Sequence, residues 1–304
     1  MSASDTSTPA VGLSEAELRE LDSLVAAALA SGDESGLRVL GYGEISLVLG
    51  WPADDPAFAC KRLPPFADRA RFDSYRRTLG DYLDALRAAG IDPVATELRP
   101  VERADGSVTG YAVQPAVPAG TLAEVVLSQA DSGQSHPLVE AVVAAAARTV
   151  SPRVGLDAQL ANWTWEEGTL AYFDITTPLL WSEDGRPRLD VDLIVQPIPW
   201  LLRGAIKRFL VPGILEGYRD LRGVYLDLCG NLIKQRLDPW LPRFIEHANE
   251  HLDPPLSTDE VRRYYRSDAR LWSMLLTIRR LDRTWQRRVR RRPYPFLLPN
   301  AIER

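Results

Sequence analysis

The alternation of apolar and polar residues predicts short strands in the first third of the chain. The runs GLRVLGYG, EISLVLGW and AFACKRL each show the short apolar pattern of a strand, and PADDP turns the chain between the second and the third. The runs ATELRPVER and SVTGYAVQPAV flank the turn at Asp105-Gly106 and predict a hairpin. We therefore expect a sheet of five antiparallel strands.

Two helices accompany these strands. Ser14 and Glu17 form an S-x-x-E capping box, which predicts a helix that runs to about Ala30. A second stretch with helical periodicity covers roughly residues 67–89, with three leucines on one face, and it ends at Gly90. This second helix is inserted after the third strand.

The pattern beyond the strands is mainly helical. The run LVEAVVAAAARTV is apolar nearly all round, so we expect a deeply buried helix there. The runs NWTWEE and TLAYFDI on either side of Gly168 predict a second, small hairpin. Residues 197–215 are apolar with cationic flanks, and we expect a core helix, which is the commoner case. The alternative is a helix that lies on a membrane surface.

The chain thus changes from strand-rich to helix-rich near residues 114–118. A length of 304 residues favours two domains or one large two-lobed unit. The first 13 residues are small, polar and proline-containing, and we expect them to be disordered. We expect an α+β fold with a strand-rich lobe over residues 14–116 and a helix-rich lobe over residues 117–304.

Composition and charge narrow the functional classes. Apolar residues make up 45% of the chain and charged residues 25%, as in globular proteins with a buried core. The formal net charge of −5 gives no indication of nucleic-acid binding. Two cysteines are too few for a disulfide framework, and no cluster has the spacing of a zinc site. No signal peptide or membrane-spanning run is visible, so we expect a cytoplasmic protein. Enrichment in arginine and alanine is typical of a GC-rich bacterial genome.

The residues that could take part in catalysis or in binding follow one another in a particular order. A glycine turn, GYGEIS, lies between the first two strands, and Lys61, one of only three lysines, stands on the third. Asp157 and Asn162 follow the buried helix at a spacing of five, and Asp174 ends the last strand. Each feature alone has an ordinary explanation, such as a tight turn, a surface lysine or a helix cap.

Taken in order, these residues resemble the protein-kinase-like fold, and especially its branch of aminoglycoside and choline phosphotransferases. The resemblance covers roughly residues 36–178. It implies a bilobal molecule with a small catalytic hairpin in the helical lobe. It also implies ATP and Mg²⁺ as cofactors and phosphoryl transfer to a hydroxyl group of a small-molecule acceptor.

The resemblance implies a role for each residue. The turn over Gly41, Tyr42, Gly43 and Ser46 brings backbone N–H groups to the ATP phosphates, and Lys61 offers its ammonium group to the same phosphates. Gln114 and Val117 belong to the hinge strand that contacts adenine. Asn162 and Asp174 are implied as Mg²⁺ ligands, and Asp157 as the base that orients and deprotonates the acceptor hydroxyl.

Several positions depart from the family pattern. Gly155 stands two residues before Asp157, where the family has a histidine, and the triplet that starts at Asp174 reads DIT. No glutamate falls in the helix over residues 67–89 to pair with Lys61, which leaves Asp81 or Asp84 as the alternative. Two other functions therefore stay open: a pseudokinase that binds nucleotide or acts as a scaffold, and transfer of AMP to a protein.

The run EGYRDLRGVYLDL carries three further acids. In small-molecule kinases such helices line the acceptor pocket, so Glu216, Asp220 and Asp227 are candidates for contact with a cationic substrate. The alternative is that they pair with Arg219 and Arg222 along the helix.

Overall fold

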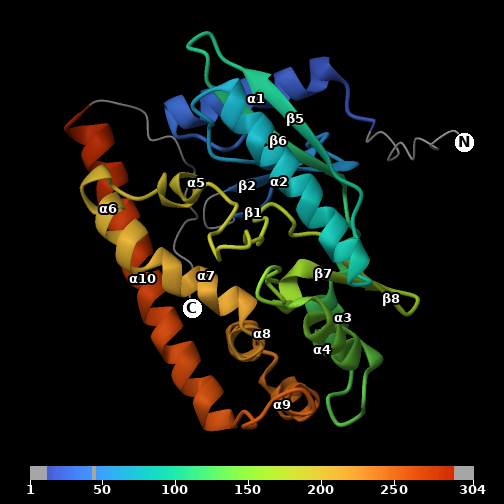
Figure 1. Cartoon of the computed structure of the whole chain (residues 1–304). Coiled ribbons are helices and arrows are strands. Elements are labelled where there is room, and N and C mark those ends of the chain that lie inside the picture. Colours follow the sequence, from blue (N-terminus) through green and yellow to red (C-terminus); the bar gives the residue numbers. More distant parts are fainter. Residues whose placement is uncertain (1–11, 43–45, 291–304) are drawn as a thin grey trace, which may run out of the picture. The chain divides into compact units, whose positions relative to one another are not determined.

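The structure is a computed structural model that describes residues 12–42 and 46–290, and it confirms the α+β class (Figure 1). The described chain forms two compact units. The first contains the residues up to Ser74, Val94–Ala116 and a stretch from Arg283, and the second contains Tyr75–Pro93 and Val117–Asp282. The helix expected over residues 67–89 runs through the boundary at Ser74.

The first unit contains the expected five-stranded antiparallel sheet. Its strands stand in the order β1-β2-β3-β6-β5. They are β1 (Val39–Tyr42), β2 (Leu47–Trp51), β3 (Phe58–Arg62), β5 (Glu97–Glu102) and β6 (Val108–Pro115). Gly106 in the β5–β6 turn has a φ of 83°. Glycine adopts this conformation more easily than other residues, which explains why the Asp105-Gly106 pair predicts the turn correctly.

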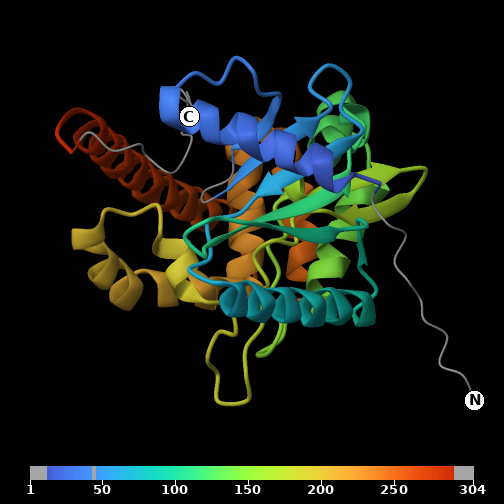
Figure 2. The same ribbon diagram turned by 90° about the horizontal axis from the view of Figure 1, so that it is seen from above.

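Helix α1 (Glu15–Ser31) covers one face of this sheet. The capping box is confirmed, because the Ser14 backbone N–H donates to the Glu17 carboxylate at 2.8 Å. Leucines and a valine of α1 pack against side chains of β2, β3 and β6 in one hydrophobic core. The first turns of α2 (Arg69–Ala88) lie on the other face, as Figure 2 shows. There Phe72 is fully buried, with its ring 5.4 Å from that of Phe66.

Polar contacts also tie α1 to the sheet. Asp22 is only 4% exposed and accepts hydrogen bonds from the Tyr111 hydroxyl at 2.8 Å and from Arg103 at 2.7 Å. Of the expected disordered segment, residues 1–11 lie outside the described residues. Leu13 is buried in the same core, and its carbonyl oxygen accepts a hydrogen bond from Arg99 at 2.9 Å. Leu13 therefore belongs to the folded core just before the capping box.

The second unit is mainly helical. Its helices are α3 (Ala123–Gln129), α4 (Pro137–Thr149), α5 (Val191–Val195), α6 (Trp200–Phe209), α7 (Val211–Arg219), α8 (Leu221–Lys234), α9 (Leu241–Asn249) and α10 (Thr258–Arg288), of which the last extends past the unit boundary at Asp282. Three short 3-10 helices occur at Ala119–Thr121, Leu160–Asn162 and Asp238–Trp240.

The predicted small hairpin is present as β7 (Trp163–Glu166) and β8 (Thr169–Tyr172), with Gly168 at a φ of 84° in the turn. A third strand, which the sequence did not predict, is β4 (Asp92–Pro93). It pairs with β8 in parallel and turns the hairpin into a three-stranded sheet.

Helices α4 and α6 differ sharply in burial. Most residues of α4 are buried, as its apolar composition predicts. Helix α6 has no buried residue, so the expectation of a core helix within residues 197–215 is wrong for this segment. Within the described ranges, no helix combines the length and the apolar character needed to cross a membrane.

We expect Asp22→Ala to lower the free energy of unfolding by about 3 kcal/mol, because it leaves buried donors of Tyr111 and Arg103 without their acceptor. Urea unfolding followed by circular dichroism measures the change. Glu15→Ala is the control, since it removes an exposed partner of Arg19 and should cost less than about 0.5 kcal/mol. Equal losses of stability in the two variants would contradict the role of Asp22 as the acceptor that holds Tyr111 and Arg103.

Candidate functional site

The β7–β8 hairpin brings together the acid and amide residues predicted for the helical part of the chain. Trp163 of β7 pairs with Tyr172 of β8, and the Phe173 N–H donates to the Asn162 carbonyl oxygen at 3.1 Å. Asn162 therefore precedes the first strand, and Asp174 follows the second, at the same open end of the hairpin.

The loop before the hairpin is closed around Asp157. The Asn162 side-chain amide donates to the Asp157 backbone oxygen at 3.1 Å, and the Tyr172 hydroxyl donates to the same oxygen at 3.1 Å. The Gln159 N–H donates to Oδ1 of Asp157 at 3.2 Å. The spacing of five between Asp157 and Asn162 thus has a direct structural use, because it lets the amide bridge its own loop.

Gly155 is required by the packing of this loop. Its N–H donates to the Leu179 oxygen at 2.8 Å, and its carbonyl oxygen accepts the Tyr82 hydroxyl at 3.1 Å. A Cβ at this position would stand 2.7 Å from the Tyr218 carbonyl oxygen and 2.9 Å from the Trp181 ring. A larger side chain, such as a histidine, has no room at this position.

The pKa of Asp157 is unusually high for an aspartate. Burial, and then the nearby charges of Asp227 and Asp174, raise its pKa to about 8. The hydrogen bonds from Gln159 and Asn162 oppose this rise by favouring the carboxylate. Three aspartates that lie close enough to influence one another electrostatically are therefore gathered in the second unit.

Asp227 belongs to this group through a chain of hydrogen bonds. The Gln159 side-chain amide donates to its Oδ2 at 3.0 Å, and the Tyr264 hydroxyl donates to its Oδ1 at 3.0 Å. Gly230, one turn further along α8, lets Tyr264 approach, since a Cβ there would lie 3.1 Å from the Tyr264 ring. Burial raises the pKa of Asp227 to about 6. The sequence pointed to Asp227 as an acceptor contact but not to its link with Asp157.

The two other acids of that run have structural roles. Glu216 pairs with Arg219 at 2.6 Å, as the alternative interpretation expected. The Asp220 carboxylate caps α8 by accepting the Gly223 N–H at 2.9 Å. Arg222 pairs instead with Glu260 of α10 at 2.7 Å.

The donor chemistry at the open end of the hairpin fits a hard cation. The Asp174 carboxylate and the Asn162 side-chain oxygen are the oxygen donors that Mg²⁺ prefers. The Thr176 hydroxyl lies 3.4 Å from Oδ1 of Asp174. The described residues contain no group of three or more His, Cys, Asp or Glu side chains arranged for a metal. Few protein ligands are typical of Mg²⁺, which takes further oxygens from phosphates and water.

The predicted nucleotide-binding residues of the first unit fall on its sheet. Gly41, Val48, Lys61 and Ala112 form one row across β1, β2, β3 and β6. Cys60 faces the α1 core, so Lys61 projects to the opposite face. That face carries short side chains next to Lys61, and a Cβ on Gly41 would meet no atom within 4 Å.

The remaining predicted residues of the nucleotide site are placed as follows. Gln114 shares the Lys61 face by register, and its amide donates to the Thr96 hydroxyl at 2.9 Å. Tyr42 belongs to the opposite face, and its hydroxyl donates to Glu34 at 2.5 Å. Ser46 directly precedes β2, and Val117 is the first residue of its segment in the second unit. Gly43 lies outside the described residues.

The acids proposed as alternative partners of Lys61 are held by arginines. Asp81 forms an ion pair with Arg188, and Asp84 pairs with Arg87 at 3.0 Å. Asp73, the acid of α2 that belongs to the first unit, accepts from Arg69 at 3.0 Å.

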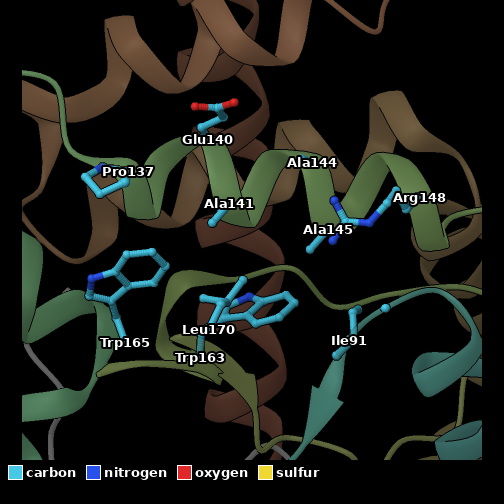
Figure 3. A pocket seen from close by; sticks show the side chains of 11 residues that line it. Ile91, Pro137, Glu140, Ala141, Ala144, Ala145, Arg148, Trp163, Trp165 and Leu170 are labelled. Atoms are coloured by element: carbon cyan, nitrogen blue, oxygen red, sulfur yellow. The ribbon is translucent and has the colours of Figure 1, made fainter. Parts of the chain in front are cut away.

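A separate cavity of about 400 Å³ lies between α4 and the β7–β8 hairpin. Figure 3 shows Ala141 and Ala145 facing the rings of Trp163 and Trp165, while Glu140 points away from them. None of the predicted site residues lines this cavity. Trp163 connects the two regions, because its indole N–H donates to the Ala158 oxygen at 3.2 Å.

We expect Gly155→Ala to destabilise the protein by about 2 kcal/mol, since the added Cβ collides with backbone and ring atoms that cannot easily move. Thermal unfolding measures the loss. Gly120→Ala is the control, because a Cβ there meets nothing within 4 Å, and we expect a change below about 0.5 kcal/mol. A Gly155→Ala protein as stable as the control would show that the loop has room for a side chain.

The raised pKa of Asp157 predicts a pH dependence of stability in buffer with a chelator. The folded value of about 8 exceeds the unfolded value of about 4, so the folded state binds the extra proton between these pH values. The free energy of unfolding should therefore fall as pH rises through this window. Asp157→Asn should flatten the fall above about pH 6, where Asp227 no longer contributes. Parallel curves for the two proteins would contradict the raised pKa.

No curated protein sequence matches the chain. Among solved structures, the amicoumacin kinase hAmiN in complex with AMP-PNP, Ca²⁺ and Ami is similar at 14% identity and a TM-score of 0.30, covering 83% of this chain and 95% of that one. Residues 20–283 match the sequence family described as a family of unknown function, DUF6206. Since the match extends over most of its length, the chain belongs to the DUF6206 family.

Proposed function

We propose that this protein has a protein-kinase-like fold and is an ATP- and Mg²⁺-dependent phosphotransferase that acts on a hydroxyl group of a small molecule. One observation carries the proposal. The Asp157 backbone oxygen closes a D-x-x-x-x-N loop by accepting the Asn162 amide, and the pKa of the Asp157 carboxyl group is raised by burial and by Asp227 and Asp174. Strongly perturbed carboxyl groups gathered in this way are characteristic of functional sites.

Asp157 is the general base in this proposal. Its Oδ1 accepts the Gln159 N–H, so we assign Oδ2 to the acceptor hydroxyl. As the new oxygen–phosphorus bond forms and the bond to the leaving ADP oxygen breaks, the hydroxyl proton passes to Oδ2. A base with a pKa close to the working pH is suited to this transfer.

Asn162 and Asp174 are the residues that would hold the cation. The hydrogen bond from the Asn162 amide nitrogen to Asp157 orients this side chain, and its oxygen is the donor assigned to the metal. Bound Mg²⁺ supplies positive charge that offsets the negative charge on the transferred phosphoryl group. A cation held there would place positive charge beside Asp174 and would lower the pKa of Asp157, whose Oδ2 accepts the proton.

We assign the nucleotide phosphates to Lys61 and to the turn over residues 41–46, and adenine to the strand end at Gln114 and to Val117. Lys61 and Gln114 share one face of the sheet, and Gly41 stands in the same row of residues as Lys61.

Asp157→Asn should lower turnover by about a thousandfold or more while nucleotide affinity stays within a few fold, because the amide keeps the size of the side chain but cannot accept the proton. A thermal shift with ATP and Mg²⁺ measures nucleotide binding. Mass spectrometry of candidate acceptors, incubated with ATP, identifies what is transferred. Asp131→Asn, in an exposed loop, is the control for loss of one carboxylate.

Four results would overturn the proposal. Full activity of Asp157→Asn would remove the base. A metal-dependent thermal shift with no transfer to any hydroxyl acceptor would favour a pseudokinase, and a gain of AMP mass in place of phosphate would favour nucleotidyl transfer. Absence of any shift with ATP and Mg²⁺ would contradict the nucleotide site itself.

A further inference from the structure

Helix α6 exposes large apolar side chains to an unusual degree. None of its ten residues is buried. Trp200 is 67% exposed, Leu201 71% and Phe209 78%, and these are among the most exposed large apolar side chains of the described chain. Such a concentration on one short helix marks a surface for interaction.

The apolar residues form a continuous stripe. Leu201, Ala205 and Phe209 follow one another at four-residue spacing, which places them along one face of the helix. Ile206 is less exposed than these three and faces the protein. The principal neighbours of α6 are α5 and α7, which flank it in the sequence. In Figures 1 and 2 the gold ribbon of α6 lies well apart from the green helices α3 and α4 of the same unit.

The polar residues of α6 carry only positive charge. The helix contains Arg203, Lys207 and Arg208 and no acidic residue. Lys207 pairs with Asp192 at 2.6 Å, so its charge is compensated within the protein. Arg203 donates to two backbone oxygens, and Arg208 stacks over the Phe209 ring at 5.7 Å. A basic edge therefore borders the apolar stripe.

We propose that α6 is a membrane-surface helix that docks the protein on anionic lipid bilayers. The helix lies parallel to the surface, with Leu201 and Phe209 in the acyl boundary and Arg208 at the lipid phosphates. Trp200 at the start of the helix has the amphipathic ring that favours the headgroup level. A helix with a strongly apolar face and a basic edge fits an anionic lipid surface better than an acidic protein groove, which would leave the tryptophan and leucine side chains without apolar contacts.

The inference does not depend on the phosphotransferase proposal, because the residues of α6 are not part of the candidate catalytic site. Docking on a bilayer would, however, restrict the place where the protein meets its phosphoryl acceptor. A catalytic unit held at a bilayer is suited to acceptors that are themselves at the membrane.

Sedimentation of the full-length protein with phosphatidylcholine vesicles, with and without phosphatidylglycerol, tests the docking surface. We expect binding to the phosphatidylglycerol vesicles and release by high salt, since the lipid attraction is screened. Phe209→Asp should weaken binding by about tenfold or more. Arg208→Glu should weaken it by about fivefold or more, as each basic residue near the surface contributes about this factor.

Matched controls separate docking from a general change of charge. Leu24→Asp and Arg19→Glu, both on exposed positions of α1, introduce the same substitutions elsewhere and should leave vesicle binding unchanged. The side chains changed on α6 are exposed, so all variants should keep the wild-type melting temperature. Absence of binding to anionic vesicles would overturn the proposal, as would equal binding by Phe209→Asp and the wild type.

Discussion

The backbone carbonyl oxygen of Asp157 accepts two hydrogen bonds, and the candidate site depends on both. One donor, the Asn162 amide, precedes β7, and the other, the Tyr172 hydroxyl, ends β8. The two strands of the hairpin are therefore tied to the same atom of the preceding loop. A slip of one residue in the β7–β8 register would turn Tyr172 to the other face of the sheet and release the loop. The position of Asp157 is thus set by the pairing of β7 with β8 as well as by the loop itself.

This closed loop gathers like charges, which is unfavourable for folding. Asp157 and Asp174 lie close to the buried Tyr82, and burial, followed by the charges of Asp227 and Asp174, raises the pKa of Asp157. A core built only for stability would place apolar side chains here. The buried, raised-pKa carboxyl group of Asp157 is a local conflict with stability, and proteins tolerate such conflicts chiefly at functional sites.

The sequence predicts those features that a few neighbouring residues encode. The capping box at Ser14 and the turns at Gly106 and Gly168 each depend on local hydrogen bonds or a local φ, and all three are present. Strand β4 was missed because its two residues gain their structure only by pairing with β8. The contact between Gln159 and Asp227 joins residues 68 positions apart, so no local sequence pattern predicts it.

The exposure of α6 was missed for a different reason. A stripe of leucine, alanine and phenylalanine at helical spacing is the same whether it faces a core or a membrane, so periodicity does not decide between them. What distinguishes the two cases is the presence of a covering element, and its principal neighbours, α5 and α7, leave the stripe exposed. Only the three-dimensional arrangement supplies that information.

Gly155 stands where the kinase-like pattern has a histidine, and the packing around it explains the small residue. On sequence alone, the loss of a histidine two residues before Asp157 is tolerable, because in the kinase-like pattern that residue scaffolds the loop and transfers no proton. The structure shows that the position must be small, since the Tyr218 carbonyl oxygen occupies the space of a side chain. Tyr82 instead anchors the Gly155 carbonyl oxygen from α2, and Tyr172 anchors that of Asp157 from β8. Two tyrosine hydroxyls hold the backbone of this loop, so no side chain at position 155 is needed to fix it.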